Sequence, residues 1–185
     1  MRGTLHSALH GTTPMSAPSL NRRRFLLTSC GVAASGCLPA YRNRWGRGAG
    51  VTVQEDVSYG AHAKQAFDLY VPQAAGSARP MAIFIHGGFA TAQDRRLYQA
   101  FTGLYGNVGT ALAHQGIITA VTGYRQHPVA TSGEQVLEDL VSAVRTLRGM
   151  SGSLHGDPKR ITLVGHSAGA MLASLLGLDA RWLGD

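Results

Sequence analysis

The stretch ITLVGHSAGAMLASLLGL, residues 161–178, contains a serine enclosed by glycines, an arrangement that could support nucleophilic chemistry. The pattern G-x-S-x-G is formed by five consecutive residues: Gly165, His166, Ser167, Ala168 and Gly169. In a nucleophile elbow of this pattern, a strained turn between a strand and a helix lifts the serine hydroxyl clear of a sheet. A chain with 24 glycines can contain the pattern by chance, as a plain glycine-rich turn. Here an apolar run precedes it and an Ala/Leu-rich segment follows, so Ser167 is predicted to be a nucleophile.

A second stretch, FIHGGF at residues 84–89, could stabilise negative charge. Acyl transfer places negative charge on the substrate carbonyl oxygen, and one backbone N–H aimed at that point changes the rate by roughly 10²–10³. Gly87 and Gly88 let the backbone approach closely, with His86 before them and Phe89 after them. Alone, HGG could be a turn that ends a strand. Followed by an elbow at the same edge of a sheet, it is predicted to be an oxyanion loop.

The elements that must position these motifs alternate between strand and helix. Apolar or alternating runs predict strands at 51–59, 66–72, 80–88, 116–124 and 161–164. Helical periodicity predicts helices at 98–115, at 132–149 with the capping-box spacing Ser132 to Gln135, and from residue 168 onward. GDPKR at 156–160 is expected to form a turn into the serine strand. The alternation predicts an α/β fold with a doubly wound, mostly parallel sheet covered on both faces.

The charge of the chain is concentrated in its first 50 residues. They contain seven of the 17 basic side chains and none of the ten acidic ones, so residues 51–185 carry ten of each. A neutral body argues against nucleic-acid binding. Both cysteines, Cys30 and Cys37, precede the body, and no His/Asp/Glu cluster has metal-ligand spacing. Neither a disulfide, nor a metal site, nor a cofactor is therefore expected in the body.

Residues 1–37 resemble an export signal. An arginine run at 22–24 precedes a short, weakly apolar stretch of small residues that ends at Cys37. A twin-arginine signal has this composition, and the apolar segment is too short to span a bilayer stably. ASGC at 34–37 is also typical of a lipoprotein processing site, with Cys37 as the lipid anchor. The alternative is a disordered basic tail. We expect export across the cytoplasmic membrane, a linker at 38–50 and a folded domain at 51–185.

Five segments follow one another in an order that resembles the α/β-hydrolase superfamily: FDLYVP, IFIHGGF, GYRQHP, EDLVSAVRTLR and GDPKRITLVGHSAGAMLASLL. Over about residues 65–180 the chain is similar to the esterase and lipase branch, which includes hormone-sensitive-lipase-like enzymes and kynurenine formamidases. The resemblance implies an α/β-hydrolase fold and Ser167 as the nucleophile of a Ser-Asp/Glu-His triad. It also implies an oxyanion hole made by the backbone N–H groups of Gly87, Gly88, Phe89 and Ala168. Two departures concern the acyl pocket, because Phe89 replaces a third glycine and YRQHP replaces the commoner YRLAP.

The partners of Ser167 are not evident in the sequence. His166 is adjacent, but neighbouring side chains on a sharp elbow diverge, and His86 is expected to brace the oxyanion loop through ring hydrogen bonds. Solvated, helix-face or capping roles are the default for the other candidates: His114, His127, His155, Glu138, Asp139 and Asp157. Arg125 could pair with an acid or line the site. The family places the triad acid and histidine after the serine, and 18 residues follow Ser167. The chain therefore resembles the amino-terminal part of a hydrolase, with a partial domain at 51–185.

These observations predict a serine hydrolase of carboxylic esters that acts through an acyl-enzyme on a small-molecule ester. Two alternatives stay open: hydrolysis of an arylformamide, and a non-catalytic α/β-hydrolase-like protein or inactive fragment in which the elbow is only scaffold. A membrane is an expected partner only through the export signal or Cys37, and the oligomeric state is left open. In a partial sheet the strand at 161–164 would lie at an edge, where unpaired backbone groups favour aggregation.

Overall fold

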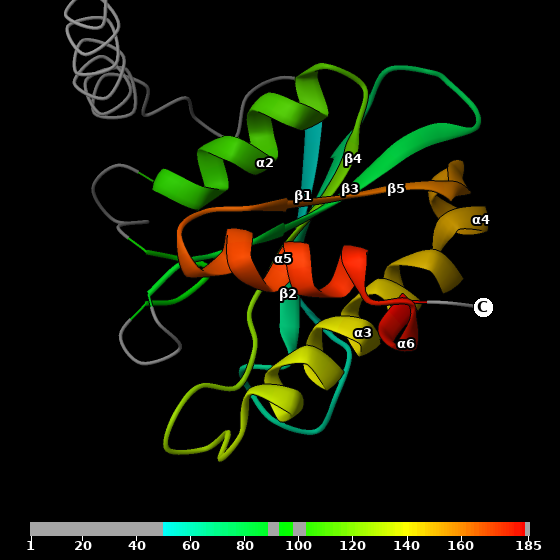
Figure 1. Ribbon diagram of the computed structural model, residues 1–185. Helices are drawn as coiled ribbons and strands as arrows, with labels where there is room; N and C mark the ends of the chain where they lie inside the picture. Colours follow the sequence, from blue (N-terminus) through cyan, green and yellow to red (C-terminus); the bar gives the residue numbers. More distant parts are fainter. Residues whose placement is uncertain (1–49, 89–92, 98–102, 184–185) are drawn as a thin grey trace, which may run out of the picture. The chain divides into compact units, whose positions relative to one another are not determined.

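The computed structural model describes residues 50–88, 93–97 and 103–183, which form a five-stranded sheet with helices (Figure 1). The strands are β1 (Val51–Ser58), β2 (Ala66–Pro72), β3 (Arg79–Ile85), β4 (Ile118–Thr122) and β5 (Gly156–Gly165). The helices are α2 (Leu104–His114), α3 (Gly133–Gly149), α4 (Ser151–Leu154), α5 (Ala168–Leu178) and α6 (Ala180–Leu183). None of these helices is long and apolar enough to cross a bilayer.

The strands lie in the order β1-β2-β4-β3-β5 across the sheet. β3 pairs in parallel with both β4 and β5, whereas β2 pairs antiparallel with β1 and with β4. Among the described strands β2 is therefore reversed and the other four point the same way. The predicted α/β fold with a mostly parallel sheet is confirmed. The carboxyl ends of β3 and β5 meet at one edge of the sheet, which is where open α/β sheets bind ligands.

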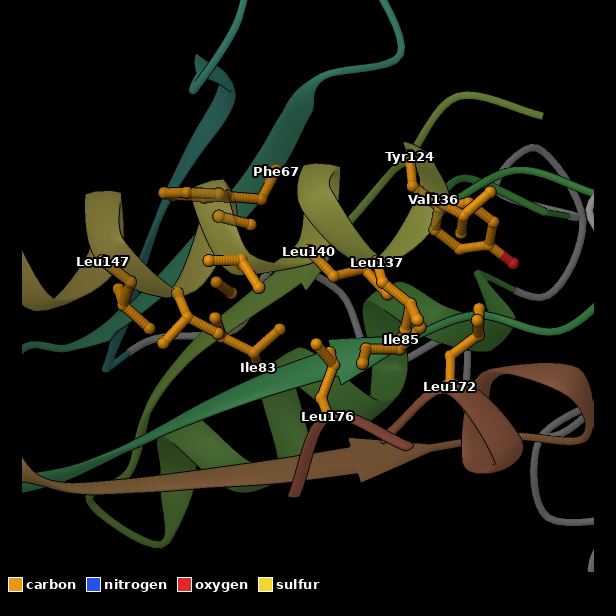
Figure 2. Packing of buried hydrophobic residues seen from close by; sticks show 14 of the residues in the cluster. Phe67, Ile83, Ile85, Tyr124, Val136, Leu137, Leu140, Leu147, Leu172 and Leu176 are labelled. Atoms are coloured by element: carbon orange, nitrogen blue, oxygen red, sulfur yellow. The ribbon is translucent and has the colours of Figure 1, made fainter. Parts of the chain in front are cut away.

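Two apolar layers hold the helices against opposite faces of the sheet. On one face, Ile85 of β3 belongs to a buried cluster with Leu140 of α3 and Leu176 of α5 (Figure 2). On the other face, Phe84 of β3 belongs to a second cluster with Tyr105 of α2. Successive residues of a strand point to opposite faces. A continuously apolar strand such as β3 is therefore buried on both sides, and the doubly wound arrangement follows.

Helix α3 begins at the position that its capping residues indicate. Ser132 is the N-cap, and its hydroxyl accepts a hydrogen bond from the Gln135 N–H at 3.3 Å. The Gln135 side-chain oxygen accepts from the Thr131 N–H at 2.9 Å. A standard capping box would direct that oxygen to the Ser132 N–H, one residue later. All six predicted apolar positions of the helix are buried: Val136, Leu137, Leu140, Val141, Val144 and Leu147.

The start of helix α2 differs from the prediction. The described helix begins at Leu104, after Gly103 in a left-handed conformation with φ of 62°. The sequence predicted a helix from residue 98, and residues 98–102 lie outside the described part of the chain. A left-handed residue cannot continue an α-helix, so the described helix begins after Gly103.

The start of β5 also differs from the prediction. The strand begins at Gly156, which pairs with Arg79, whereas Ile161 pairs with Met81. The predicted GDPKR turn is therefore a bulge between two paired positions of one strand. Asp157 still provides turn chemistry, because its Oδ1 accepts a hydrogen bond from the Lys159 N–H at 2.9 Å.

β5 forms an edge of the described sheet, the position at which the sequence analysis expected this strand. Its apolar residues Ile161, Leu163 and Val164 are only half-buried. Helix α5, which follows β5, exposes three large apolar side chains: Met171, Leu175 and Leu178. In the described residues, this edge and helix face therefore leave apolar side chains partly or fully exposed next to the elbow.

Candidate active site

Ser167 occupies the turn between β5 and α5, and its backbone is strained. Its φ of 53° and ψ of −122° lie in a region that residues with a side chain rarely adopt. Such conformations cost about 1–3 kcal/mol and cluster at functional sites. Ser167 is exposed and directly precedes the first residue of α5. This is the geometry of a nucleophile elbow.

The two flanking glycines allow the elbow to pack on the end of β3. A Cβ built on Gly165 would lie 2.3 Å from the carbonyl oxygen of Gly169, and one built on Gly169 would lie 2.1 Å from the carbonyl oxygen of Ile85. Both contacts are with backbone atoms, which cannot rotate away. The first turn of α5 therefore rests directly on β3, and this contact places Ser167 beside the segment that follows β3.

The HGG segment lies against the elbow. A Cβ at Gly87 would lie 3.1 Å from Cβ of Ser167 and 3.0 Å from the carbonyl oxygen of His166. The His166 N–H donates to the carbonyl of Ile85 at 3.1 Å. Gly88 has φ of 106°, in the region that favours glycine. The predicted oxyanion loop and the predicted nucleophile are thus in backbone contact.

The predicted oxyanion donors have different surroundings. The Gly87 N–H donates to the Tyr105 hydroxyl at 3.3 Å. This N–H therefore faces the first turn of α2 in the described structure. Ala168 is the first residue of α5, and the first N–H groups of a helix have no acceptor within the helix. Phe89 lies outside the described residues. Gly87, Gly88, Phe89 and Ala168 stay the predicted donors.

His86 lies behind the loop and is 1% exposed. Its Nδ1 is 2.7 Å from the carbonyl oxygen of Gly87, which can only accept, so the ring donates there. Burial lowers the pKa of His86 below its ordinary value, and the ring is neutral at neutral pH. It stacks on Tyr124 with 4.4 Å between ring centroids, and the Tyr124 hydroxyl donates to the His86 carbonyl at 2.9 Å. His86 therefore contacts the loop in the way the sequence predicted.

The other histidines and acids considered from sequence lie away from Ser167 or on the surface. Exposed side chains belong to His114, His127, His155 and Glu138. Asp157 lies in the β5 bulge. Within the described residues, no group of three or more His, Cys, Asp or Glu side chains could hold a metal ion.

Arg125 and Asp139 form an ion pair whose carboxylate is buried, and this pair decides between the two roles that the sequence left open for Arg125. Arg125 Nη2 lies 2.6 Å from Asp139 Oδ1, and the Arg125 N–H donates to Oδ2 at 2.8 Å. Gln65 Nε2 donates to the same carboxylate at 2.7 Å. Asp139 is 1% exposed. The pair fixes the segment after β4 to helix α3.

A charged network anchors residues 93–97, which follow the oxyanion loop in the chain. Arg96 donates to both carboxylate oxygens of Asp68 on β2, at 2.8 and 2.7 Å. Burial disfavours the charged form of Asp68, but the bonds from Arg96 and the Asp56 N–H outweigh it and lower the Asp68 pKa. Arg95 pairs with Asp56, and Lys64 Nζ lies 2.7 Å from Asp94. Residues 93–97 are thus tied to the sheet by ion pairs.

Two residues near the elbow were missed by the sequence analysis. The Tyr105 hydroxyl contacts Gly87, Gln93 and His166, at 3.3, 2.9 and 3.1 Å. Gln93 also packs below Gly88, where a Cβ would lie 2.5 Å from the Gln93 Cβ. Neither residue belongs to a sequence motif, and no local pattern marks them, because their partners are distant in the chain.

Comparisons with known proteins show the family to which the chain belongs. The profile of the BD-FAE family matches residues 67–182, which is more than half of the chain. The chain belongs to the BD-FAE family. Isoprenylcysteine alpha-carbonyl methylesterase of Arabidopsis thaliana is 31% identical over 127 residues, covering 69% of this chain and 28% of the methylesterase. Kynurenine formamidase of Salmo salar is 28% identical over 130 residues, covering 69% of this chain and 39% of the formamidase.

A solved structure supports the same assignment. Esterase B of Lactobacillus rhamnosis matches this BD-FAE chain with a TM-score of 0.62 and 26% identity, over 83% of this chain and 48% of the esterase. The α/β-hydrolase fold of the esterase branch is therefore confirmed. The chain spans between about a quarter and a half of the length of these three proteins.

Proposed function

We propose that this BD-FAE protein hydrolyses carboxylic esters through an acyl-enzyme on Ser167. The observation that carries the proposal is the contact between two backbone segments, the strained turn at Ser167 and the loop at Gly87. If an ester bound between these two segments, its carbonyl carbon would face the Ser167 hydroxyl. Its oxygen would meet N–H donors from the loop and from the start of α5. The similarity to a methylesterase and to esterase B supports an ester as the substrate class.

The proposed reaction has two acyl transfers. Ser167 Oγ bonds to the ester carbonyl carbon while a general base takes the hydroxyl proton. The tetrahedral oxyanion accepts hydrogen bonds from Gly88, Phe89 and Ala168, and then expels the alcohol, which leaves with a proton. Water attacks the acyl-enzyme in the same way and releases the acid and Ser167. Each N–H that points at the oxyanion contributes roughly 10²–10³ to the rate.

The base is proposed to come from outside the described residues. Among those residues, the Ser167 hydroxyl makes no hydrogen bond to a histidine. His166 directs Nδ1 to the Tyr105 hydroxyl, and His86 directs Nδ1 to the Gly87 carbonyl. The α/β-hydrolase order places the triad acid and histidine after the serine, so we assign the base to that part of the fold.

Hydrolysis of an arylformamide is the second candidate, and the similarity to kynurenine formamidase favours it. Both reactions pass through an acyl-enzyme, so both need the same elbow and oxyanion loop. They differ in the leaving group, which is an alcohol in one and an aromatic amine in the other. Rates on a p-nitrophenyl ester and on an aryl formamide, measured with one preparation, separate the two candidates.

Covalent labelling tests the proposed nucleophile. A fluorophosphonate should form one adduct, on the peptide that contains Ser167, and Ser167→Ala should remove it. Ser174→Ala is a matched control, because Ser174 is an exposed serine of the same helix whose hydroxyl donates to the Ala170 carbonyl at 2.9 Å. An adduct that maps elsewhere contradicts the proposal. The absence of any adduct would favour the non-catalytic alternative.

We also propose that residues 1–37 direct export, with Cys37 as a lipid anchor; these residues lie outside the described part of the chain. Changing Arg22, Arg23 and Arg24 together to lysine should retain the protein in the cytoplasm, because the arginines are the element that the receptor reads. Cys37→Ser should release the exported protein from the membrane fraction. Cell fractionation measures both, and unchanged export of the triple-lysine variant would refute the twin-arginine assignment.

A further inference from the structure

We propose that Tyr105 is the residue that positions the oxyanion loop against the nucleophile elbow. The inference rests on the proposed function, because the value of this positioning lies in acyl transfer to Ser167. Its evidence is a single hydroxyl that contacts three separate segments: the loop through Gly87, the elbow through His166, and residues 93–97 through Gln93.

The three contacts use the full hydrogen-bonding capacity of the hydroxyl, which has one proton to donate and two lone pairs. The side-chain oxygen of Gln93 only accepts, so the Tyr105 proton goes there, at 2.9 Å. The hydroxyl oxygen then accepts from the Gly87 N–H at 3.3 Å and from His166 Nδ1 at 3.1 Å. His166 must therefore carry its proton on Nδ1. The tautomer of the residue beside Ser167 is thus set by Tyr105.

The hydroxyl is held in place by buried surroundings. Tyr105 is 2% exposed, and its ring packs against Phe84 of β3 with 5.2 Å between ring centroids. It lies in the first turn of α2, which starts after the left-handed Gly103. Burial raises the pKa of Tyr105 above its ordinary value, although the Gly87 N–H opposes this. The hydroxyl therefore stays protonated, as its bond to Gln93 requires.

Gln93 links the Tyr105 hydroxyl to the loop, because it is itself held by Gln126 and packs against Gly88. The Gln93 carbonyl accepts a hydrogen bond from Gln126 Nε2 at 2.8 Å. The Gln93 side chain packs under Gly88, which has a positive φ. Gly87 is held through its N–H and Gly88 through this packing. The direction of the Gly88 N–H depends on both restraints.

Tyr105→Phe is the test, and Tyr59→Phe is its matched control. Phenylalanine keeps the ring and removes only the oxygen. Tyr59 is partly buried, and its hydroxyl donates to the Gly123 carbonyl at 2.7 Å, away from the elbow. Two measurements on the full chain do not depend on activity: amide hydrogen exchange of Gly87, and the ¹⁵N chemical shifts of the His166 ring. The third measurement is the rate of fluorophosphonate labelling of Ser167.

In the unmodified chain we expect His166 to be protonated on Nδ1. In Tyr105→Phe the Gly87 amide should exchange at least about tenfold faster, and the His166 ring should shift toward the other tautomer. Labelling of Ser167 should slow by about 10–100-fold, up to the loss expected for one oxyanion donor. Tyr59→Phe should change none of the three, although both variants lose a hydrogen-bonded hydroxyl.

The outcomes separate this inference from the proposed function. Unchanged Gly87 exchange and an unchanged His166 tautomer in Tyr105→Phe would overturn the positioning role, whatever the labelling rate. An unmodified protein that is not labelled at Ser167 would refute the proposed function alone, because exchange and tautomer still report on Tyr105. Equal slowing of labelling in both tyrosine variants would also overturn the inference, since the effect would then be a general loss of stability.

Discussion

Replacing Gly169 by alanine should destabilise the folded protein by about 3 kcal/mol or more and remove the reactivity of Ser167. The added Cβ would lie 2.1 Å from the carbonyl oxygen of Ile85 and 2.6 Å from that of His86. Both atoms belong to the backbone at the end of β3, so relief requires α5 to move away from the sheet. That movement would carry Ser167 away from the oxyanion loop. Urea denaturation and fluorophosphonate labelling measure the two effects.

Gly177→Ala is the control for this prediction. Gly177 lies in the same helix, and a Cβ there would meet nothing within 4 Å. Alanine has the higher helix propensity, so this variant should be more stable by about 0.5 kcal/mol. The same substitution in one helix is therefore expected to act in opposite directions at two positions. A Gly169→Ala variant with unchanged stability would show that α5 does not rest on β3 as described.

The parts of the site that could be predicted from the sequence are those that depend on neighbouring residues. The strain of Ser167 and the close approach of Gly165 and Gly169 are properties of one turn, so a five-residue pattern contains their signal. The same holds for the cap of α3, where Ser132 and Gln135 lie within one helical turn. Periodic apolar positions likewise predicted the strands and the buried face of α3.

The parts that could not be predicted depend on residues far apart in the chain. Tyr105 contacts His166 across 61 positions, and no periodicity or motif relates the two. The partner of the Gly87 N–H could not be predicted for the same reason, because its acceptor is the Tyr105 hydroxyl, 18 positions away in the chain. The sequence could not show this contact, because the position of α2 relative to the loop depends on how the whole sheet folds.

The ion pair of Arg125 and Asp139 is a similar case, and it bears on stability. The residues lie 14 positions apart, with Arg125 after β4 and Asp139 in α3. The carboxylate accepts hydrogen bonds from the Arg125 side chain, the Arg125 N–H and Gln65. Removing one partner of a buried pair costs more than the pair contributes, because the other charge is left without compensation. Asp139 is 1% exposed and the Arg125 side chain 25%, so some water can reach the arginine that remains.

Asp139→Ala should therefore lower the free energy of unfolding by about 3 kcal/mol, at the lower end of the range for broken buried pairs.

Asp179→Ala is a matched control, because Arg181 Nη2 also lies 2.6 Å from Asp179 Oδ2, but the Arg181 side chain is 82% exposed. Surface pairs contribute little in water, so this variant should unfold at the same denaturant concentration as the unmodified protein. Adding Arg125→Met to Asp139→Ala should cost little more than Asp139→Ala alone, since it removes the uncompensated charge. Equal losses at Asp139 and Asp179 would mean that burial is not what makes the inner pair important. An additive loss in the double variant would mean that Arg125 stabilises the fold through contacts other than its carboxylate.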